Sequence, residues 1–401
     1  MSFVLLALWS ATGIVLVSDA VSCGVDLERK ATSLGSSMLD DANPKPAKGP
    51  HKSDPKSRHR SAQKRRPRRL YAAVDLGTNN CRLLIVERSG ERNFRVRDSF
   101  TRIVRLGEGL EAAGRLSDAA MDRTIAALRI CASKIRKANV ARMRCVATEA
   151  CRGADNGAAF IERVRKETGL RLEIIDGKAE AELAAIGCGS LFDREVDDII
   201  LFDIGGGSTE ISRMSRKEAG HFFQLVDSDS VPLGVVRLSE RHAGPGPTEH
   251  GYQGMLDESV ARLAAFMDRQ TGLDDMRKVQ IIGTSGTVTT LAAVQLGLAR
   301  YDRNVVDGCT ISAGDISTVI QRLRQMSRDQ LADNPCIGKE RADLVLSGCA
   351  VLEAIHTRWP VEKVWVADRG LREGLLLRML RQDSRRRGRR NRRGRRPDKA
   401  E

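Results

Sequence analysis

Residues 198–210 read DIILFDIGGGSTE, and they decide the fold because a similar stretch, YAAVDLGTNN, occurs at residues 71–80. Each stretch begins with an apolar run of the length of a buried strand and ends in Asp-x-Gly followed by hydroxyl or amide residues. Two strand-like segments then follow in each case: CRLLIVERSG and NFRVRDSFTRIVRL after the first stretch, TEISRMSR and HFFQLVDSDSVPLGVVRL after the second. The chain therefore contains two passages that begin alike.

The likeness continues into a predicted helix after the third strand of each passage. Apolar residues recur at the spacing of one helical face at positions 121, 125, 128, 132 and 135, and again at 256, 260, 263 and 267. Strands alternating with helices follow in both passages, which indicates α/β sheets covered on their faces. We expect duplicated domains at residues 70–195 and 196–380, hinged near 190–198, whose glycine loops face each other across one phosphate-binding cleft.

The charge of the chain is concentrated at its ends. The 401 residues carry a formal net charge of +15, of which residues 1–69 contribute +7 and residues 381–401 contribute +8, so residues 70–380 have no net charge. This distribution excludes a basic nucleic-acid-binding domain in the folded part. We expect both charged ends, 1–69 and the Arg-rich 381–401, to be disordered. They serve either solubility or an electrostatic contact with a polyanion such as RNA or polyphosphate.

The sequence favours a reducing compartment. Its nine cysteines are scattered, without a CxxC pair, which predicts neither a disulfide framework nor a zinc site. The apolar run from Phe3 to Val17 resembles a secretory signal but lacks a positively charged segment before it. Residues 1–22 are therefore interpreted as a signal-like segment, an unstructured extension or a start assigned too far upstream. We expect a cytoplasmic protein with no membrane span.

Three loops have the composition of phosphate-binding turns. The first carries Asp75, Gly77, Thr78 and Asn79; the second carries Asp203, Gly205, Gly206, Gly207 and Ser208; the third carries Gly283, Thr284, Ser285 and Gly286. Glycines in such turns permit positive φ and let backbone N–H groups point at a phosphate. An Asp before the loop can hold Mg²⁺, which prefers oxygen ligands and keeps several waters. Any one loop could be an ordinary turn, but three at matching positions favour phosphate. Walker A and GxGxxG motifs are absent from the sequence, so P-loop and Rossmann folds are excluded.

Six segments together resemble one family. AVDLGTNNCRLLI, VATEACR, DGKAEAEL, FDIGGGSTEIS, VPLGVVRLSER and IIGTSGTVTTLA occur in this order over about residues 70–380. The set is similar to the exopolyphosphatase/guanosine-pentaphosphate phosphohydrolase (Ppx/GppA) family, which belongs to the actin and sugar-kinase superfamily. The resemblance implies two actin-like (ribonuclease H-like) domains and Mg²⁺-dependent hydrolysis of a terminal phosphoanhydride, in polyphosphate or guanosine pentaphosphate.

The resemblance also assigns roles to residues. Glu180 resembles the catalytic base that activates water, although its position at a helix start also suits a solvated glutamate stabilised by the helix dipole. Asp203 and Glu210 resemble the acidic pair that handles metal and attacking water, with Asp75 as a further metal-binding candidate. Arg152 resembles a phosphate-binding arginine, a role suited to its guanidinium fork. The first loop, with Arg82, matches the family's first phosphate loop, except that Asn80 stands where Ser is commoner.

Alternatives to a hydrolase remain open from the sequence. One is a kinase of the same superfamily, and another is a non-catalytic sensor that binds polyphosphate or an alarmone through the same loops. Longer members of the family carry an additional helical C-terminal domain that this sequence lacks, so it resembles a short two-domain form. The sequence therefore leaves open whether the protein forms a homodimer and whether it binds very long polymers.

Overall fold

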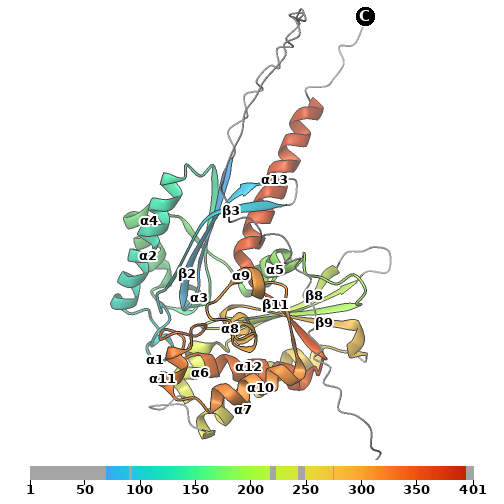
Figure 1. Ribbon diagram of the computed structural model, residues 1–401. Helices are drawn as coiled ribbons and strands as arrows, with labels where there is room; N and C mark the ends of the chain where they lie inside the picture. The colour runs from blue at the N-terminus through green and yellow to red at the C-terminus, as the bar shows by residue number, and fades with distance from the viewer. Residues whose placement is uncertain (1–68, 90–92, 217–222, 243–248, 274, 394–401) are drawn as a thin grey trace, which may run out of the picture. The chain divides into compact units, whose positions relative to one another are not determined.

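The computed structural model describes residues 69–89, 93–216, 223–242, 249–273 and 275–393, all within one compact unit (Figure 1). The expected disorder of residues 1–68 and 394–401 lies outside these residues.

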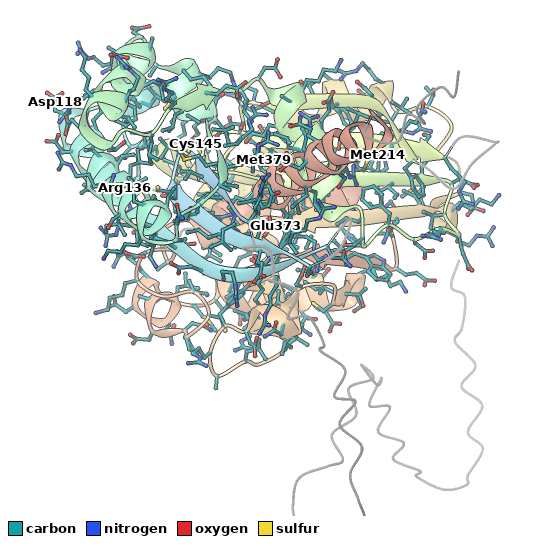
Figure 2. All side chains as sticks on the ribbon, turned by 90° about the horizontal axis from the view of Figure 1, so that it is seen from above. Asp118, Arg136, Cys145, Met214, Glu373 and Met379 are labelled. Carbon is teal, nitrogen blue, oxygen red and sulfur yellow. The ribbon has the colours of Figure 1, made fainter. Side chains whose placement is uncertain are left out.

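The first half of the molecule is built on a five-stranded sheet. Three consecutive strands pair antiparallel, and two further strands extend the sheet in parallel on the other side of the first strand, giving the order β3-β2-β1-β4-β5. Its elements are β1 (Leu70–Leu76), β2 (Asn80–Arg88), β3 (Phe94–Ile103), α1 (Leu110–Ala113), α2 (Asp118–Lys137), β4 (Arg142–Ala147), α3 (Glu149–Gly153), α4 (Gly157–Thr168) and β5 (Leu172–Ile174). Figure 2 shows α2 at the outer flank of this half, between its labelled ends Asp118 and Arg136.

The second half repeats this order and adds one edge strand, giving β10-β11-β9-β6-β7-β8. Several helices between β9 and β11 enlarge it and cover its sheet. Its elements are β6 (Asp198–Ile204), β7 (Thr209–Arg216), β8 (Phe223–Val231), α6 (Val235–His242), α7 (Glu249–Arg269), β9 (Val279–Thr284), α8 (Gly286–Gln295), α9 (Arg303–Val306), β10 (Thr310–Ser312), α10 (Ala313–Arg324), α11 (Arg328–Asp333), α12 (Val345–Arg358) and β11 (Lys363–Ala367).

The duplication extends to the register of the strands. Asp75 lies opposite Arg82 in the first hairpin, and Asp203 lies opposite Glu210 in the second. A bulge follows in each half, ten residues after the Asp, at Ile85 and at Arg213. The predicted α/β fold with two actin-like halves is therefore confirmed.

Two helices cross between the halves, which corrects the domain boundaries drawn from the sequence. α5 (Gly177–Cys188) follows the first sheet, but its Ala184 and Cys188 pack against Ile199 and Leu201 of the second. α13 (Leu371–Arg393) follows the second sheet but covers the first, with Leu375, Leu376, Met379 and Leu380 in the same apolar cluster as Tyr71 and Ala73. Boundaries at residues 195 and 380 therefore do not separate the packing units.

The expected disorder from residue 381 onward is wrong as far as residue 393. α13 continues to Arg393, beyond the edge of the body in Figure 1. The buried Asp383 carboxylate accepts a hydrogen bond of 2.8 Å from Tyr71 and pairs with Arg142, while Ser384 accepts one of 2.6 Å from Arg88. Arg is a good helix former, and a buried face ending in an anchored Asp explains why the charged segment stays helical.

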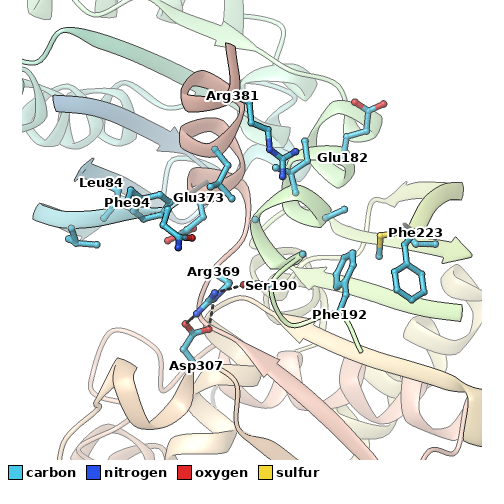
Figure 3. Close-up of a pocket in the computed structure, with 18 of the residues that line it drawn as sticks. Leu84, Phe94, Glu182, Ser190, Phe192, Phe223, Asp307, Arg369, Glu373 and Arg381 are labelled. Atoms are coloured by element: carbon cyan, nitrogen blue, oxygen red, sulfur yellow. Dashed lines mark hydrogen bonds and ion pairs between the residues drawn. The ribbon is translucent and has the colours of Figure 1, made fainter. Parts of the chain in front are cut away.

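Three further features bear on function. None of the helices in the described part of the chain is long and apolar enough to cross a membrane. The seven cysteines other than Cys309 within the described residues are buried free thiols. A groove of about 1320 Å³ lies between the halves beside the crossing helices, lined by Phe94, Phe192, Phe223 and Arg381 among others (Figure 3).

Candidate active site

Two equivalent hairpin turns meet at the centre of the cleft. The Gly77 N–H donates to the Asn80 carbonyl, and the Gly205 N–H donates to the Ser208 carbonyl, both at 2.9 Å. A Cβ added to Gly206 would lie 3.1 Å from the Thr78 Cβ, and one added to Gly207 would lie 2.6 Å from the Thr78 Oγ1. The glycines of the second turn are therefore needed for the close approach of the two hairpins.

Positive φ, which the sequence suggested for these glycines, is not found in the turns of either hairpin. In the third loop it occurs at Ser285, a residue with a side chain, at φ 100°. The Ser285 Oγ caps α8 by accepting a hydrogen bond of 3.3 Å from the Thr287 N–H. A non-glycine residue in this region stores backbone strain, and such strain is concentrated at functional sites.

Four carboxylates surround the cavity between the hairpins: Glu210 is buried, and Asp75, Asp203 and Glu180 are half-buried. Asp75 and Asp203 come from the ends of β1 and β6, Glu210 from β7 and Glu180 from the first turn of α5. Burial raises the pKa of all four, to about 6 for Asp203 and about 7 for Glu210. The neighbouring carboxylates raise these pKa values further, because like charges in a dry site disfavour ionisation.

Glu210 is held by two hydroxyl groups. Ser208 and Ser230 donate hydrogen bonds of 2.6 and 2.7 Å to its Oε1. These hydrogen bonds oppose the effect of burial and lower the Glu210 pKa. Glu210 is thus fixed in place, with its charge partly stabilised.

Glu180 differs because one of its oxygens has no hydrogen-bond partner. Its helix is capped by Asp176, whose side chain accepts a hydrogen bond of 2.7 Å from the Ala179 N–H. The Glu180 Oε2 is buried and lies 3.7 Å from the Arg152 Nη1, too far for a hydrogen bond. A buried acceptor without a partner is costly, so this oxygen is available to a water or substrate in the cavity.

Two arginines supply positive charge to the cavity. Arg82, opposite Asp75, lowers the pKa of Asp75 and Asp203. Arg341 donates a hydrogen bond of 3.0 Å to the Thr290 Oγ1, and burial together with the nearby Arg82 lowers its pKa. Two half-buried guanidinium groups that repel each other suit a ligand with negative charge.

The cavity brings together most of the residues predicted from the sequence. It is lined by Asp75, Gly77, Thr78, Asn79, Arg82, Glu180, Asp203, Gly205, Gly206, Gly207, Ser208, Glu210, Ser285 and Gly286. Three predicted residues lie outside its lining. Gly283 packs against the Phe202 ring, the Thr284 hydroxyl donates to the Arg369 carbonyl at 2.8 Å, and Arg152 binds Glu149 and the Ile175 carbonyl.

Five polar residues that line the cavity were not among the predicted site residues: Asn80, Thr148, Thr287, Thr290 and Arg341. Thr148 follows β4 as Ser285 follows β9, so the duplication itself could have indicated it. Arg341 precedes α12 in a turn, and no signal in its own neighbourhood distinguishes it from a surface arginine.

A family model matches this chain over residues 85–383, and its description is "Ppx/GppA phosphatase family". The chain belongs to the Ppx/GppA phosphatase family. The resemblance drawn from the six sequence segments is thereby confirmed. The expected enzyme class, a hydrolase of the exopolyphosphatase type, agrees with the names of its relatives.

The chain matches some members of the Ppx/GppA family over nearly their whole length and others over only part of it. It is 32% identical to exopolyphosphatase 2 of Mycobacterium tuberculosis over 76% of this chain and 97% of that protein. It is 29% identical to guanosine-5'-triphosphate,3'-diphosphate pyrophosphatase of Aeromonas hydrophila, over 78% of this chain but 59% of that protein.

Solved structures of the Ppx/GppA family agree with the fold. A family member from Aquifex aeolicus matches with a TM-score of 0.65 at 26% identity, covering 79% of this chain and 99% of that one. An exopolyphosphatase from Cytophaga hutchinsonii matches with a TM-score of 0.70 at 25% identity, covering 78% and 98%.

The carboxylates of this Ppx/GppA chain do not form a complete metal cage. Among the described residues, no three Asp, Glu, His or Cys side chains lie close enough together to hold a metal ion by themselves. The metal-binding candidates Asp75, Asp203 and Glu210 therefore do not form such a group by themselves, and their part in binding metal stays a prediction. Mg²⁺ is commonly held by one or two carboxylates together with waters and substrate phosphates, and the half-buried Asp75 and Asp203 fit this pattern.

Proposed function

We propose that the chain hydrolyses a terminal phosphoanhydride and releases phosphate from inorganic polyphosphate, guanosine pentaphosphate or both. The observation that carries this proposal is the buried Oε2 of Glu180, which has no hydrogen-bond partner, at a cavity lined by two phosphate-type turns. The exopolyphosphatase relative is covered over 97% of its length and the pyrophosphatase over 59%. This difference makes polyphosphate the first substrate to test.

In the proposed mechanism, the terminal phosphate lies between the Thr78–Asn79 and Gly205–Ser208 turns. The hydroxyl group of Thr78 and backbone N–H groups of the two turns donate to its oxygens, while the Ser208 hydroxyl stays on Glu210. Arg82 and Arg341 neutralise the charge of the phosphates that follow. Electrostatic stabilisation of this kind supplies most of the catalysis in phosphoryl transfer.

Glu180 takes a proton from the attacking water in this mechanism. Burial and the neighbouring carboxylates raise its pKa, so it becomes a stronger base than an exposed glutamate. Glu210, held by Ser208 and Ser230, orients the same water from the other hairpin.

Asp75 and Asp203 would hold Mg²⁺, which supplies Lewis-acid polarisation of the phosphoryl oxygens when bound. Both carboxylates lie at strand ends that face the cavity, and burial raises the pKa of each. A cation between them would relieve this unfavourable burial of negative charge. A cytoplasmic location and a homodimer stay predictions.

Phosphate release by the full chain tests the proposal. We expect release from polyphosphate or guanosine pentaphosphate, but not from ATP, and its loss when EDTA removes divalent metal. Glu180→Gln should lower kcat by about 10²–10⁴-fold while substrate still binds. The matched control is Glu182→Gln on the same helix, because 41% of the Glu182 side chain is exposed and it pairs with Arg378 at 3.2 Å. Binding without turnover in the wild-type protein would favour a sensor instead.

A further inference from the structure

Arg152 lies beside the catalytic candidate Glu180 and outside the lining of the cavity. Its Nη1 donates 2.7 Å to the Ile175 carbonyl and lies 3.7 Å from the Glu180 Oε2. Its Nη2 donates 2.8 Å to the Glu149 Oε2 and lies 3.5 Å from the Ser230 Oγ, which itself binds Glu210. With both terminal nitrogens engaged in this way, Arg152 is placed to fix Glu180 rather than to bind phosphate.

Glu149 connects Arg152 to the other half of the molecule. Its Oε1 accepts a hydrogen bond of 2.8 Å from Arg237 on α6, and only 15% of its side chain is exposed. A Cβ added to Gly207 would lie 2.9 Å from the Glu149 Cγ, so the stem of Glu149 lies directly against the second turn. Glu149 therefore contacts the second half through both its stem and its charge.

Arg237 is rigidly connected to the second turn. The N–H groups of Val235 and Val236, at the start of α6, donate to the carbonyls of Gly205 and Gly206 at 3.0 and 2.9 Å. Arg237 is the next residue of the helix, so its backbone moves with the turn. When the turn approaches Thr78, Arg237 approaches Glu149.

The geometry points to a positioning chain, Arg237–Glu149–Arg152, that places Glu180 only when the two halves are closed. In the closed arrangement Arg237 fixes one oxygen of Glu149, and the other oxygen then orients Arg152 beside Glu180. Opening separates Arg237 from Glu149 and leaves Arg152 free to turn away. The inference rests on the proposed function, in which Glu180 activates water, and it couples that activation to enclosure of the substrate.

A neighbouring ion pair provides the matched control. Arg241, one turn further along α6, also reaches across the cleft and pairs with Glu111, but it continues to Glu258 and not to Glu149. A change at Arg241 weakens the contact between the halves but leaves the hydrogen bonds from Arg237 to Glu149 and from Arg152 to Glu149 in place, although Glu111 also lies 3.8 Å from the Arg237 Nε. Comparison of Arg237 with Arg241 thus separates positioning of Glu180 from closure in general.

The test is a double-mutant cycle measured by steady-state phosphate release from polyphosphate with the full chain and Mg²⁺. We expect Arg237→Ala to lower kcat by about 10–10²-fold with little change in KM, since misplacing a catalytic group by about 1 Å costs about that much. In the Glu180→Gln background the same substitution should change the residual rate by less than about twofold, because residues acting as a unit are not additive. Arg241→Ala should leave kcat nearly unchanged.

Equal fold losses from Arg237→Ala in both backgrounds would overturn the inference, as would an unchanged kcat in the single variant. Arg237→Lys, which keeps the charge, should recover part of kcat, and thermal unfolding of each variant shows whether it folds. If Arg237→Ala misfolds, the cycle is run with Glu149→Gln, for which the same two outcomes apply. If Glu180→Gln alone keeps the wild-type rate, the proposed base is overturned. If Glu180→Gln is nearly inactive but Arg237→Ala lowers its residual rate by the same factor as in the wild type, only the positioning chain is overturned.

Discussion

The two halves of this Ppx/GppA protein use the same hairpin for opposite purposes. Each hairpin has an Asp at the end of its first strand and the same backbone hydrogen bond across its turn. Across from that Asp, however, the first half has Arg82 and the second has Glu210. At the tip, the side chains of Thr78 and Asn79 in the first half lie against Gly206 and Gly207 of the second.

The difference shows how a duplicated fold becomes one asymmetric site. If both halves carried the acidic residue, four carboxylates and Glu180 would face one cavity with fewer cations to balance them. If both carried side chains at the tip, the two turns could not approach each other. The two halves therefore complement each other: the first supplies a cation and side chains at the tip of its turn, and the second supplies an acid and glycines.

The largest effect is expected from making the two tips alike. Gly207→Ala places a Cβ 2.6 Å from the Thr78 Oγ1 and 2.9 Å from the Glu149 Cγ, so the turns must separate. We expect phosphate release to fall by about 10²-fold, because displacement of catalytic groups by about 1 Å has that cost. A rate within about twofold of the wild type would show that the turns do not need this approach. Thermal unfolding distinguishes a local displacement from loss of the fold.

A smaller effect is expected from Glu210→Gln, which removes the charge of the residue opposite Asp203. The Glu210 pKa is raised from 4.5 to about 7, so the folded protein binds more protons than the unfolded chain between these values. Its stability relative to Glu210→Gln must therefore fall as the pH rises from about 4.5 to 7. In EDTA, we expect the variant to be more stable than the wild type at pH 8, by on the order of 3 kcal/mol, and similar at pH 4.5.

The first half should respond in the opposite direction. Arg82 lowers the pKa of Asp75 and Asp203, so Arg82→Gln leaves these two half-buried carboxylates without that cation. We expect this variant to be less stable than the wild type, with a larger deficit at pH 8 than at pH 4.5. Thermal unfolding of Glu210→Gln and Arg82→Gln at both pH values tests this. If both variants were less stable than the wild type at pH 8, or both more stable, the contrast between the two halves would be contradicted.

The sequence predicted the parts of this site that depend on short-range patterns. Apolar runs ending in Asp-x-Gly specified the strands, the turns and the position of Asp75 and Asp203 at strand ends, because a strand and its hairpin are local. Glu180 could be placed only through the family resemblance, since a glutamate in the first turn of a helix is common. Its unpartnered oxygen depends on residues from both halves.

What the sequence could not predict depends on long-range packing. Arg341 reaches the cavity because α12 packs beside α8, and its own neighbours give no sign of this. The exchange of α5 and α13 between the sheets likewise follows from which apolar face each helix buries. Charge was also misleading at residue 381, where an arginine-rich segment continues a helix because Asp383 is anchored on its buried face.

The smallest effect on turnover is expected from the end of α13, which is the other place where the halves differ. α5 ends at Cys188, whereas its counterpart α13 continues to Arg393. We propose that this arginine-rich end contacts polyanions, including long polyphosphate. Truncation after Ser384 removes it but keeps Asp383, which binds Tyr71, so the fold should persist. We expect unchanged release of phosphate from short substrates. The affinity for long polyphosphate should be weaker at low salt and depend less on the salt concentration.

Truncation after Arg381 is the contrasting variant, because it also removes the Asp383 anchor and should lower thermal stability. Equal affinity for long polyphosphate with and without residues 385–401 would show that the extension of α13 has no part in substrate binding.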